Sequence, residues 1–298
     1  MLKLLKIHER KIYGGLILFF LSLNFLIWTR VFDLSGKAEL MVSFFDVGQG
    51  DAIFIEARDG SQILIDGGPD GRILSYLGGA MPYGDNFIDA VIVSHPHADH
   101  IAGLIKVLEK YDIGMIIESG VFYDTPEIRE LRNLVSEKGI KKVVVERPLK
   151  LSFFEGAVLK FLYPDTSYAE SIVKDVNETS LVAMLEYGGN PQTSLKARKI
   201  LFTGDAGRVT EAKLIKAGVL EDVDVLKVGH QGSKYSSTKE FLNKILPAYA
   251  VVSVGKNSYG HPTPEALSRL ASVGAEIFRT DRDGTVTLEI RNGELFWR

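Results

Sequence analysis

Residues 94–100 read Ser94-His95-Pro96-His97-Ala98-Asp99-His100; they follow the apolar run 90–93 and precede the helix-like run 101–108. Three histidines and an aspartate within six positions form a density of metal ligands that packing does not require. Imidazole nitrogens and carboxylate oxygens suit zinc, manganese or iron. In α/β folds, ligand sites lie in the loops after the carboxyl ends of strands. The sequence therefore predicts a metal site between a buried strand and a helix.

Other histidines and aspartates share this position after strand-like runs. The chain has six histidines, and His230 and His261 both follow apolar runs outside the cluster. Asp66 and Asp205 do so too, although each alone is also typical of a turn or a helix cap. The shared position disfavours the alternative of a polar turn with incidental histidines. The candidate ligands that we expect to converge are Asp66, His95, His97, Asp99, His100, Asp205 and His230. Two metal ions about 3.5–4 Å apart would polarise a substrate and generate hydroxide at neutral pH, and Asp205 is a candidate to bridge them.

Composition limits the classes of protein and ligand. The chain has 298 residues, is 46% hydrophobic and 24% charged, and contains no cysteine. Disulfides and thiolate ligands are therefore excluded, and a metal site must use His, Asp, Glu or Asn. The net charge is −3, and residues 1–37 carry six basic and two acidic side chains, a surplus of +4 that leaves −7 for the remainder. That balance disfavours a protein that binds nucleic acid through charge alone.

The segment 12–28 is almost entirely apolar and contains no charged residue. Its 17 residues reach the lower limit for crossing a hydrocarbon core of roughly 30 Å. Four basic residues precede it, which favours a cytoplasmic amino end. We predict that residues 1–37 form a cytoplasmic tail and an uncleaved single-pass anchor in the cell membrane, with the rest of the chain outside. The alternatives are a cleaved signal peptide, which would give a secreted protein, and a buried helix.

Beyond residue 37, strand-like and helix-like segments alternate. Strands are expected at 40–47, 52–57, 62–65, 88–94, 113–117, 141–145, 158–162, 180–187, 200–203, 223–228, 248–254, 276–278, 286–290 and 295–297. Helices are expected at 101–110, 126–138, 209–217, 241–245 and 264–272, and an exposed hairpin loop at 188–199. This order fits two sheets flanked by helices. No segment resembles a linker, so we take residues 38–298 as one domain.

Several motifs carry a resemblance to a known family. The cluster at 95–100, together with Asp66, Asp205 and His230, resembles the signature of the metallo-β-lactamase superfamily. Five stretches are similar to the carboxy-terminal domain of the ComEC competence proteins: 46–52, 64–68, 201–205, 227–233 and 259–262. The resemblance covers about residues 38–298. It implies a four-layer αββα sandwich, two divalent metal ions and hydrolase chemistry, and for ComEC-like domains a proposed nuclease that acts on DNA.

The same resemblance implies a role for each ligand. The first ion would be held by His95 and His97, the second by Asp99, His100 and His230, and Asp205 would bridge them. Asp66 and Asn177 would lie behind the ligands and orient them. The superfamily often has a further histidine before the bridging aspartate, where this chain has Asn177 and Ser180. One ion in place of two is therefore an alternative. The chain also has Gln231 where the family tends to have a second histidine after His230.

The resemblance also suggests how catalysis would proceed. Asp99 would hold the attacking hydroxide, and His261 would protonate the leaving oxygen or bind a phosphate oxygen. A structural histidine in a Gly-His-Pro turn is the alternative for His261. The residues expected to contact substrate are Asp46, Gln49, Asp51, Ser233 and Lys234, with ordinary turn carboxylates or a solvated lysine as the alternatives.

Three functions follow from this sequence. The first is a metal-dependent phosphodiesterase or nuclease that acts on DNA outside the cytoplasmic membrane. The second is a metallo-hydrolase of small esters, lactones or β-lactams. The third is a non-catalytic binding module on the same fold. DNA uptake itself is not implied, because the one apolar segment at 12–28 cannot form a DNA pore.

Overall fold

A computed structural model describes residues 13–26, 28, 38–154, 156–189 and 196–298. The chain divides into two compact units, Met1–Ala38 and Glu39–Arg298. In the first unit, residues 13–26 form a helix, whereas residues 12 and 27 of the predicted anchor lie outside the described residues. No helix among the described residues is both long and apolar enough to cross a membrane, so the predicted transmembrane helix is not supported.

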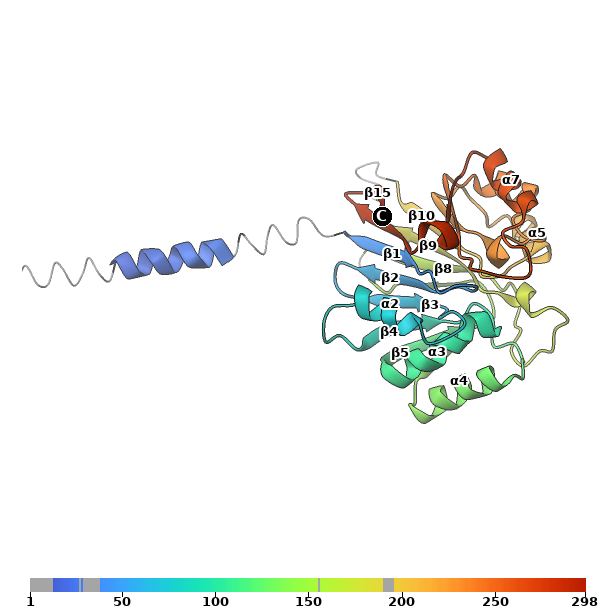
Figure 1. Cartoon of the computed structure of the whole chain (residues 1–298), viewed down its shortest axis with the longest axis horizontal. Helices are drawn as coiled ribbons and strands as arrows, with labels where there is room; N and C mark the ends of the chain where they lie inside the picture. The colour runs from blue at the N-terminus through green and yellow to red at the C-terminus, as the bar shows by residue number, and fades with distance from the viewer. Residues whose placement is uncertain (1–12, 27, 29–37, 155, 190–195) are drawn as a thin grey trace, which may run out of the picture. The chain divides into compact units, whose positions relative to one another are not determined.

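The second unit contains two β-sheets (Figure 1). The first has eight strands in the order β15-β14-β1-β2-β3-β4-β5-β6. Their bounds are β1 (Leu40–Phe44), β2 (Ile53–Ala57), β3 (Gln62–Ile65), β4 (Phe87–Ile92), β5 (Asp112–Glu118), β6 (Lys141–Val144), β14 (Val286–Arg291) and β15 (Glu294–Trp297). Strands β3 to β6 are parallel and the others pair antiparallel. The parallel strand β3 is buried along its whole length, as expected for a sheet covered on both faces.

The second sheet has seven strands in the order β13-β12-β11-β10-β9-β8-β7. Their bounds are β7 (Leu149–Leu151), β8 (Ala157–Tyr163), β9 (Val182–Tyr187), β10 (Arg198–Phe202), β11 (Val225–Lys227), β12 (Tyr249–Val252) and β13 (Glu276–Arg279). Strands β10 to β13 are parallel and β7 to β10 antiparallel. Along β8, buried and partly buried residues alternate strictly, because one face of the strand packs on the core.

Helices cover the outer faces of both sheets. Their bounds are α2 (Ile73–Ala80), α3 (Ala98–Lys110), α4 (Pro126–Glu137), α5 (Arg208–Ala217), α6 (Lys239–Ile245), α7 (Pro264–Ser272) and α8 (Thr280–Asp283), with 3₁₀ turns η1 (Val176–Thr179) and η2 (Gly229–Gly232). Two of them begin with a threonine cap and a proline. The side chain of Thr125 accepts a hydrogen bond from the Ile128 amide, and Thr263 accepts one from Ala266. Such caps satisfy amides that the first helical turn leaves unpaired.

Three apolar cores hold the layers together. The central core lies between the two sheets and includes Leu40 and Ile55 from the first sheet and Leu159 and Ile200 from the second. Side chains of α2, α3 and α4 pack on the outer face of the first sheet, and those of α5, α6 and α7 on the second. The ribbons of α2, α3 and α4 lie along the first sheet in Figure 1. Burying each large aliphatic side chain contributes about 1.5–3 kcal/mol. The predicted αββα sandwich is confirmed.

Some element boundaries differ from those predicted. Helix α3 begins at Ala98, whereas the apolar pattern predicted a start at residue 101. The first turn of α3 carries polar ligands, so it has no apolar periodicity to reveal it. Helix α2 and the short edge strand β7 were not predicted. Part of the predicted hairpin loop, residues 190–195, lies outside the described residues.

Candidate metal centre

The histidine cluster lies where the chain leaves β4 and enters α3. His97 is the N-cap residue of α3, with φ −73° and ψ 147°, and Asp99 and His100 lie in its first turn. An acidic side chain in that position interacts favourably with the helix dipole. His95 and His100 are buried, whereas Asp99 is about a third exposed, with a side-chain exposure of 36%. The cluster therefore has a buried floor and one carboxylate that reaches solvent.

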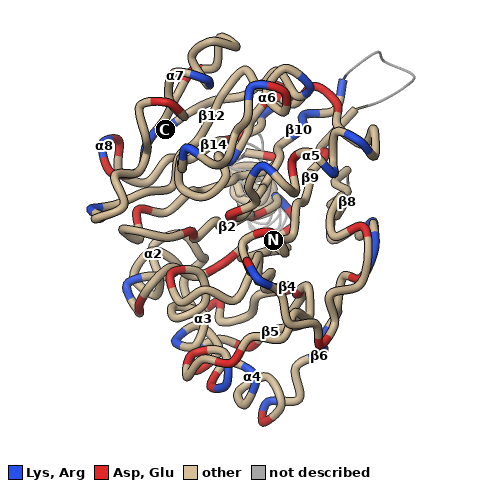
Figure 2. The backbone as a smooth tube through the Cα atoms, turned by 90° about the vertical axis from the view of Figure 1, so that its right-hand side faces the viewer, with Lys and Arg blue, Asp and Glu red and all other residues tan. Residues whose placement is uncertain are grey.

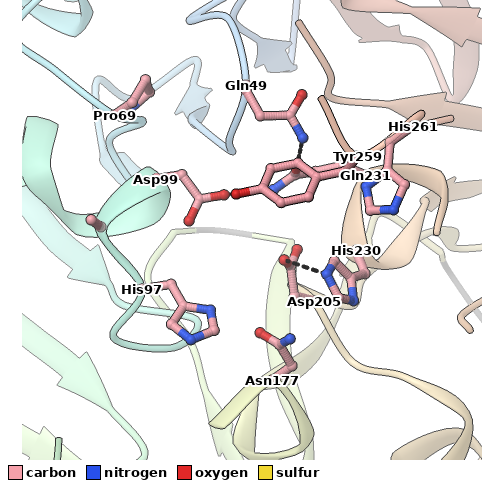
Figure 3. Close-up of a pocket in the computed structure, with 11 residues that line it drawn as sticks. Gln49, Pro69, His97, Asp99, Asn177, Asp205, His230, Gln231, Tyr259 and His261 are labelled. Carbon is pink, nitrogen blue, oxygen red and sulfur yellow. Dashed lines mark hydrogen bonds and ion pairs between the residues drawn. The ribbon is translucent and has the colours of Figure 1, made fainter. Parts of the chain in front are cut away.

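Two further ligands reach this place from the second sheet. Asp205 follows β10, and His230 lies in η2 after β11. Asp205 Oδ2 is 3.5 Å from His100 Nε2, and its distances to the Nε2 atoms of two other histidines are 3.9 Å for His95 and 3.8 Å for His230. These distances are too long for hydrogen bonds. They are near the separation of roughly 3.4 Å between two atoms bound tetrahedrally to one ion at about 2.1 Å. In Figure 3, Asp205 faces His230 and His97 across one cavity. This geometry suits a carboxylate that binds a metal ion together with histidines of both sheets.

Unpaired atoms test whether a cation fits. His100 Nε2 and Asp205 Oδ1 are buried and have no hydrogen-bond partner among the described residues. Buried polar atoms without a partner are rare in native proteins, and each calls for an explanation. The ligand atoms of His95, His100 and Asp205 all lie within 4.8 Å of one another. A divalent cation would satisfy the unpaired atoms, so the residues fit the metal that the sequence predicts.

Asp66 supports His100 from behind. Its Oδ2 lies 2.8 Å from His100 Nδ1, while its Oδ1 accepts a hydrogen bond of 2.8 Å from the Ser94 amide. The Ser94 hydroxyl also donates to Asp66 Oδ2 at 2.6 Å. Asp66 has a positive φ of 57°, a backbone conformation that costs free energy and is found mainly where the surroundings enforce it. The contact to Nδ1 directs Nε2 of His100 towards Asp205, which is the geometry that the orienting role predicted for Asp66 requires.

The charges of the ligands are set by burial and by each other. Burial lowers the pKa of His95 well below its usual value, and it lowers that of His97 as well. Burial also disfavours charge on His100, but Asp205 and Asp66 outweigh it and raise the pKa of His100 well above normal. Burial opposes ionisation of Asp205 too, yet His100 holds the pKa of Asp205 well below normal. Asp205 is therefore a carboxylate and His95 and His97 are neutral, the forms that bind metal.

A cavity of about 540 Å³ opens above the ligands (Figure 3). It is lined by Gln49, Pro69, His97, Ala98, Asp99, Asn177, Asp205, His230, Gln231, Tyr259 and His261. Asn177 thus lies on the cavity wall beside Asp205 rather than behind the ligands. His261 is half-buried, and its ring centroid is 5.5 Å from that of His230. The cavity brings the metal ligands, His261 and Gln49 together.

Four of the five predicted substrate contacts do not line this cavity. Asp51 was expected at the rim but is only 1% exposed, because it pairs with a buried lysine beneath His100. Ser233 is also buried, with its hydroxyl 3.3 Å from the Tyr235 amide. Asp46 accepts a hydrogen bond from the Gly48 amide, and Lys234 is exposed beside the ring of Tyr235.

Two residues of the site have roles that the sequence did not predict. Gln231 donates a hydrogen bond of 2.9 Å to Asp99 Oδ2, and the amide of Gln49 bonds to Gln231 in turn. His230 and Gln231 both have positive φ, 48° and 52°, so the loop is held in a costly conformation that aims both side chains at the centre. The other residue is the fully buried Lys227. The only signal for either was its place in the motif 227–233.

The class of protein follows from comparison as well as from geometry. The family model of the metallo-beta-lactamase superfamily matches residues 45–256. The chain belongs to this superfamily, and its family and site together support a metal-dependent hydrolase.

Curated relatives narrow the resemblance. The chain is 29% identical over 282 residues to ComE operon protein 3 of Bacillus subtilis (strain 168), and this alignment covers 87% of the chain and 34% of that protein. It is 29% identical over 261 residues to competence protein ComA of Neisseria gonorrhoeae, covering 86% and 33%. Recombination protein 2 of Haemophilus influenzae is 28% identical over 266 residues, covering 86% and 29%. The chain thus spans about a third of the length of these relatives, and its predicted resemblance to ComEC-family proteins is confirmed.

Solved structures support the fold alone. CmlA, a diiron beta-hydroxylase from Streptomyces venezuelae, matches with a TM-score of 0.54 and 16% identity over 85% of this chain and 55% of its own. Igni18, a metallo hydrolase from the archaeon Ignicoccus hospitalis, matches with a TM-score of 0.52 and 18% identity over 84% of this chain and 99% of its own.

Proposed function

We propose that this chain is a metal-dependent phosphodiesterase that hydrolyses DNA. The observation that carries the proposal is the position of Asp205, whose Oδ2 faces nitrogens of His95, His100 and His230 at 3.5–3.9 Å beside an open cavity. Relatives named as competence and recombination proteins favour DNA as the substrate. Phosphodiester hydrolysis by paired divalent ions is a chemistry that such a ligand set suits.

In this proposal the ligands would divide into two groups around Asp205. His95 and His97 would hold one ion, and Asp99, His100 and His230 the other, with zinc, manganese or iron as the candidates. Bound there, divalent ions would polarise the phosphodiester and make a water molecule acidic enough to attack at neutral pH. The ligand shell therefore supplies the electrophilic part of the chemistry.

Other residues of the cavity would handle the proton and the substrate. Asp99 is partly exposed and fixed by Gln231, so it can accept the hydrogen bond of the attacking water and hold it in line with phosphorus. Burial lowers the pKa of His261, and its imidazole is therefore neutral at pH 7. A neutral imidazole still donates one N–H. We assign His261 to hydrogen bonding with a phosphate or leaving-group oxygen.

A polymer also needs contacts beyond the reacting phosphate. Arg208 and Lys234 both lie over the ring of Tyr235, with charged groups 4.9 and 5.1 Å from its centroid. These three exposed residues follow the ligands Asp205 and His230 closely in the sequence. Tyr259 on the cavity wall is 74% exposed. Exposed cations and aromatic rings are the groups that bind DNA phosphates and bases. Figure 2 shows that basic and acidic positions are otherwise mixed over the unit.

A cleavage assay tests this function. The metal-free chain is loaded with manganese or zinc, and single- and double-stranded DNA are each offered as substrate. We expect cleavage that chelator abolishes and that His97→Ala reduces at least about 100-fold, because one ion loses a ligand. The matched control is Lys213→Met, which lies outside the cavity. A folded, metal-loaded wild-type chain that cleaves neither DNA form would refute the proposal.

The cavity volume favours a second candidate. A volume of about 540 Å³ lies within the range of small-molecule sites. A hydrolase of small esters, lactones or β-lactams would use the same ligands. Turnover of such substrates without DNA cleavage would select it, and metal binding without turnover of either class would indicate a binding module.

The place of action is a further part of the proposal. The basic residues before segment 12–28 favour an amino end in the cytoplasm. We propose that the hydrolase unit acts outside the cytoplasmic membrane. Cleavage of DNA by intact cells that express the chain, compared with cells that express His97→Ala, tests this location.

A further inference from the structure

Lys227 is a charged residue that the proposed catalysis leaves unused. It is the last residue of β11, and its side chain is 0% exposed. Lysine is almost never buried so completely unless its charge is paired. Its ammonium donates hydrogen bonds to the Asp51 carboxylate, and to the Gly204 carbonyl oxygen at 3.2 Å. Both acceptors lie in loops that reach the metal centre.

These two loops belong to different sheets. Asp51 lies between β1 and β2 of the eight-stranded sheet, and its Oδ2 is 3.8 Å from His100 Nδ1. Gly204 follows β10 of the seven-stranded sheet and directly precedes Asp205. One ammonium therefore connects the side of the sandwich that carries His100 with the side that carries Asp205.

The surrounding carboxylates show why a cation is needed here. Two groups among the described residues have the spacing of metal ligands, and both contain His100. One adds His95 and Asp205, and the other adds Asp51 and Asp66. In the second group, Asp66 is already bonded to His100, and Lys227 already supplies a positive charge to Asp51. The second group therefore has the spacing of a metal site, but the ammonium of Lys227 already provides the positive charge that a metal ion would supply.

We propose that Lys227 is a positioning residue of the metal centre. Its ammonium takes the place of a metal ion beside Asp51 and fixes the backbone that carries Asp205. The inference rests on the metal centre of the proposed function but not on the substrate. It separates the roles of two buried aspartates: Asp205 binds metal, whereas Asp51 holds the lysine that sets the position of Asp205.

Neutral replacement of the pair tests this role. Lys227→Met alone leaves the Asp51 carboxyl buried without its cation, which destabilises the fold whether the carboxyl stays charged or takes up a proton. In Lys227→Met/Asp51→Asn both charges are gone, and we expect the unfolding midpoint to recover relative to the single variant. Metal affinity should not recover: it should be about 10–100-fold weaker than in the wild type, as for other residues that support ligands. Competition with a chromophoric chelator measures affinity and stoichiometry.

A spectrum separates positioning from a general structural role. Cobalt bound at the centre reports its ligand geometry through visible absorption, and we expect that absorption to change in the double variant. The control is Lys213→Met, which removes a lysine of α5 bonded to Tyr163 and Tyr168 at 2.9 and 3.1 Å. Lys213→Met should alter stability but leave cobalt absorption and metal affinity unchanged. A double variant with wild-type affinity, stoichiometry and absorption would overturn the inference.

A milder variant covers the case in which the double variant does not fold. Asp51→Asn removes the counter-charge but keeps an oxygen that accepts a hydrogen bond from Lys227, and the Gly204 carbonyl accepts another. We expect some loss of stability, a fold that persists because the ammonium stays hydrogen-bonded, and metal affinity about tenfold weaker. Unchanged affinity in Asp51→Asn would contradict the inference. A wild type that binds metal but does not cleave DNA would refute the proposed substrate and leave the role of Lys227 standing. A wild type that binds no metal would refute both.

Discussion

At the scale of single residues, the position of the Asp99 carboxylate depends on a hydrogen bond from the side-chain amide of Gln231. Gln231 donates to Asp99 Oδ2 at 2.9 Å and is itself bonded to Gln49. We expect Gln231→Ala to free the Asp99 carboxylate and to lower metal affinity or hydrolysis by about 10–100-fold, as loss of a ligand-supporting hydrogen bond does elsewhere. Steady-state cleavage and metal competition measure the two effects. Gln231→Asn is the control, because it keeps the amide group but shortens the side chain by one methylene. Full activity in Gln231→Ala would contradict this role of Gln231.

His100 gives the site a defined dependence on pH. Burial opposes its charge, but Asp205 and Asp66 outweigh burial and raise its pKa well above normal. A metal ion binds only the neutral imidazole. We therefore expect metal binding at pH 7 to release a proton from His100, and metal affinity to rise about tenfold per pH unit below that pKa. Calorimetry in buffers of different ionisation enthalpy measures the release, and binding without proton release would refute this assignment.

Single residues also show where sequence reasoning ends. His95, His97 and His100 were predicted as neighbours because they lie within six positions of one another in the sequence. The convergence of Asp205 and His230 with them was inferred from their shared position after strands and from a resemblance, since more than a hundred residues separate the two groups in the sequence. Lys227 carried no signal beyond its place in the motif 227–233. A lysine at a strand end is usually solvated, and only the packing of Asp51 and Gly204 around it makes it buried.

At the scale of elements, the loop after β1 packs against the first turn of α3. A Cβ atom at Gly50 would lie 2.0 Å from the backbone oxygen of Asp99. Gly50→Ala should therefore push the loop away from the ligands and cost about 1–3 kcal/mol of stability through overpacking, besides its backbone penalty. Denaturant unfolding measures the loss, and metal affinity should fall with it.

Gly60 provides the matched control. It also has a positive φ, 90° against 131° at Gly50, but a Cβ atom there would meet nothing within 4 Å. Gly60→Ala should therefore show the backbone penalty alone and keep wild-type metal affinity. Equal stabilities for the two variants would mean that the close approach at Gly50 does not matter.

Helices and strands were predicted well where their apolar residues pack in the core, and poorly where they do not. All strands except β7 were predicted from apolar runs, and buried residues of these runs form the central core. Helix α3 was predicted three residues too short, because Ala98, Asp99 and His100 serve the metal centre instead of continuing the apolar stripe. Local sequence patterns record packing, so segments that serve chemistry are assigned least well.

At the scale of the whole molecule, the metal centre takes its ligands from both sheets. His95, His97 and His100 come from the side of the first sheet, and Asp205 and His230 from the second. Ions that bind ligands from both sides can bind the folded state but not an unfolded chain in which these residues are far apart. Occupied sites should therefore add to the stability of the unit as a whole.

The size of this effect follows from mass action. A ligand present at 100 times its dissociation constant stabilises the folded state by about 2.7 kcal/mol. We expect chelator to lower the midpoint of denaturant unfolding of metal-loaded protein by a corresponding amount, and zinc or manganese to restore it. His97→Ala, which lacks one ligand, should respond less to either treatment. If chelation removes a measured metal and the midpoint stays constant, the ions do not join the two sheets; a shift shared equally by His97→Ala would place them elsewhere on the protein.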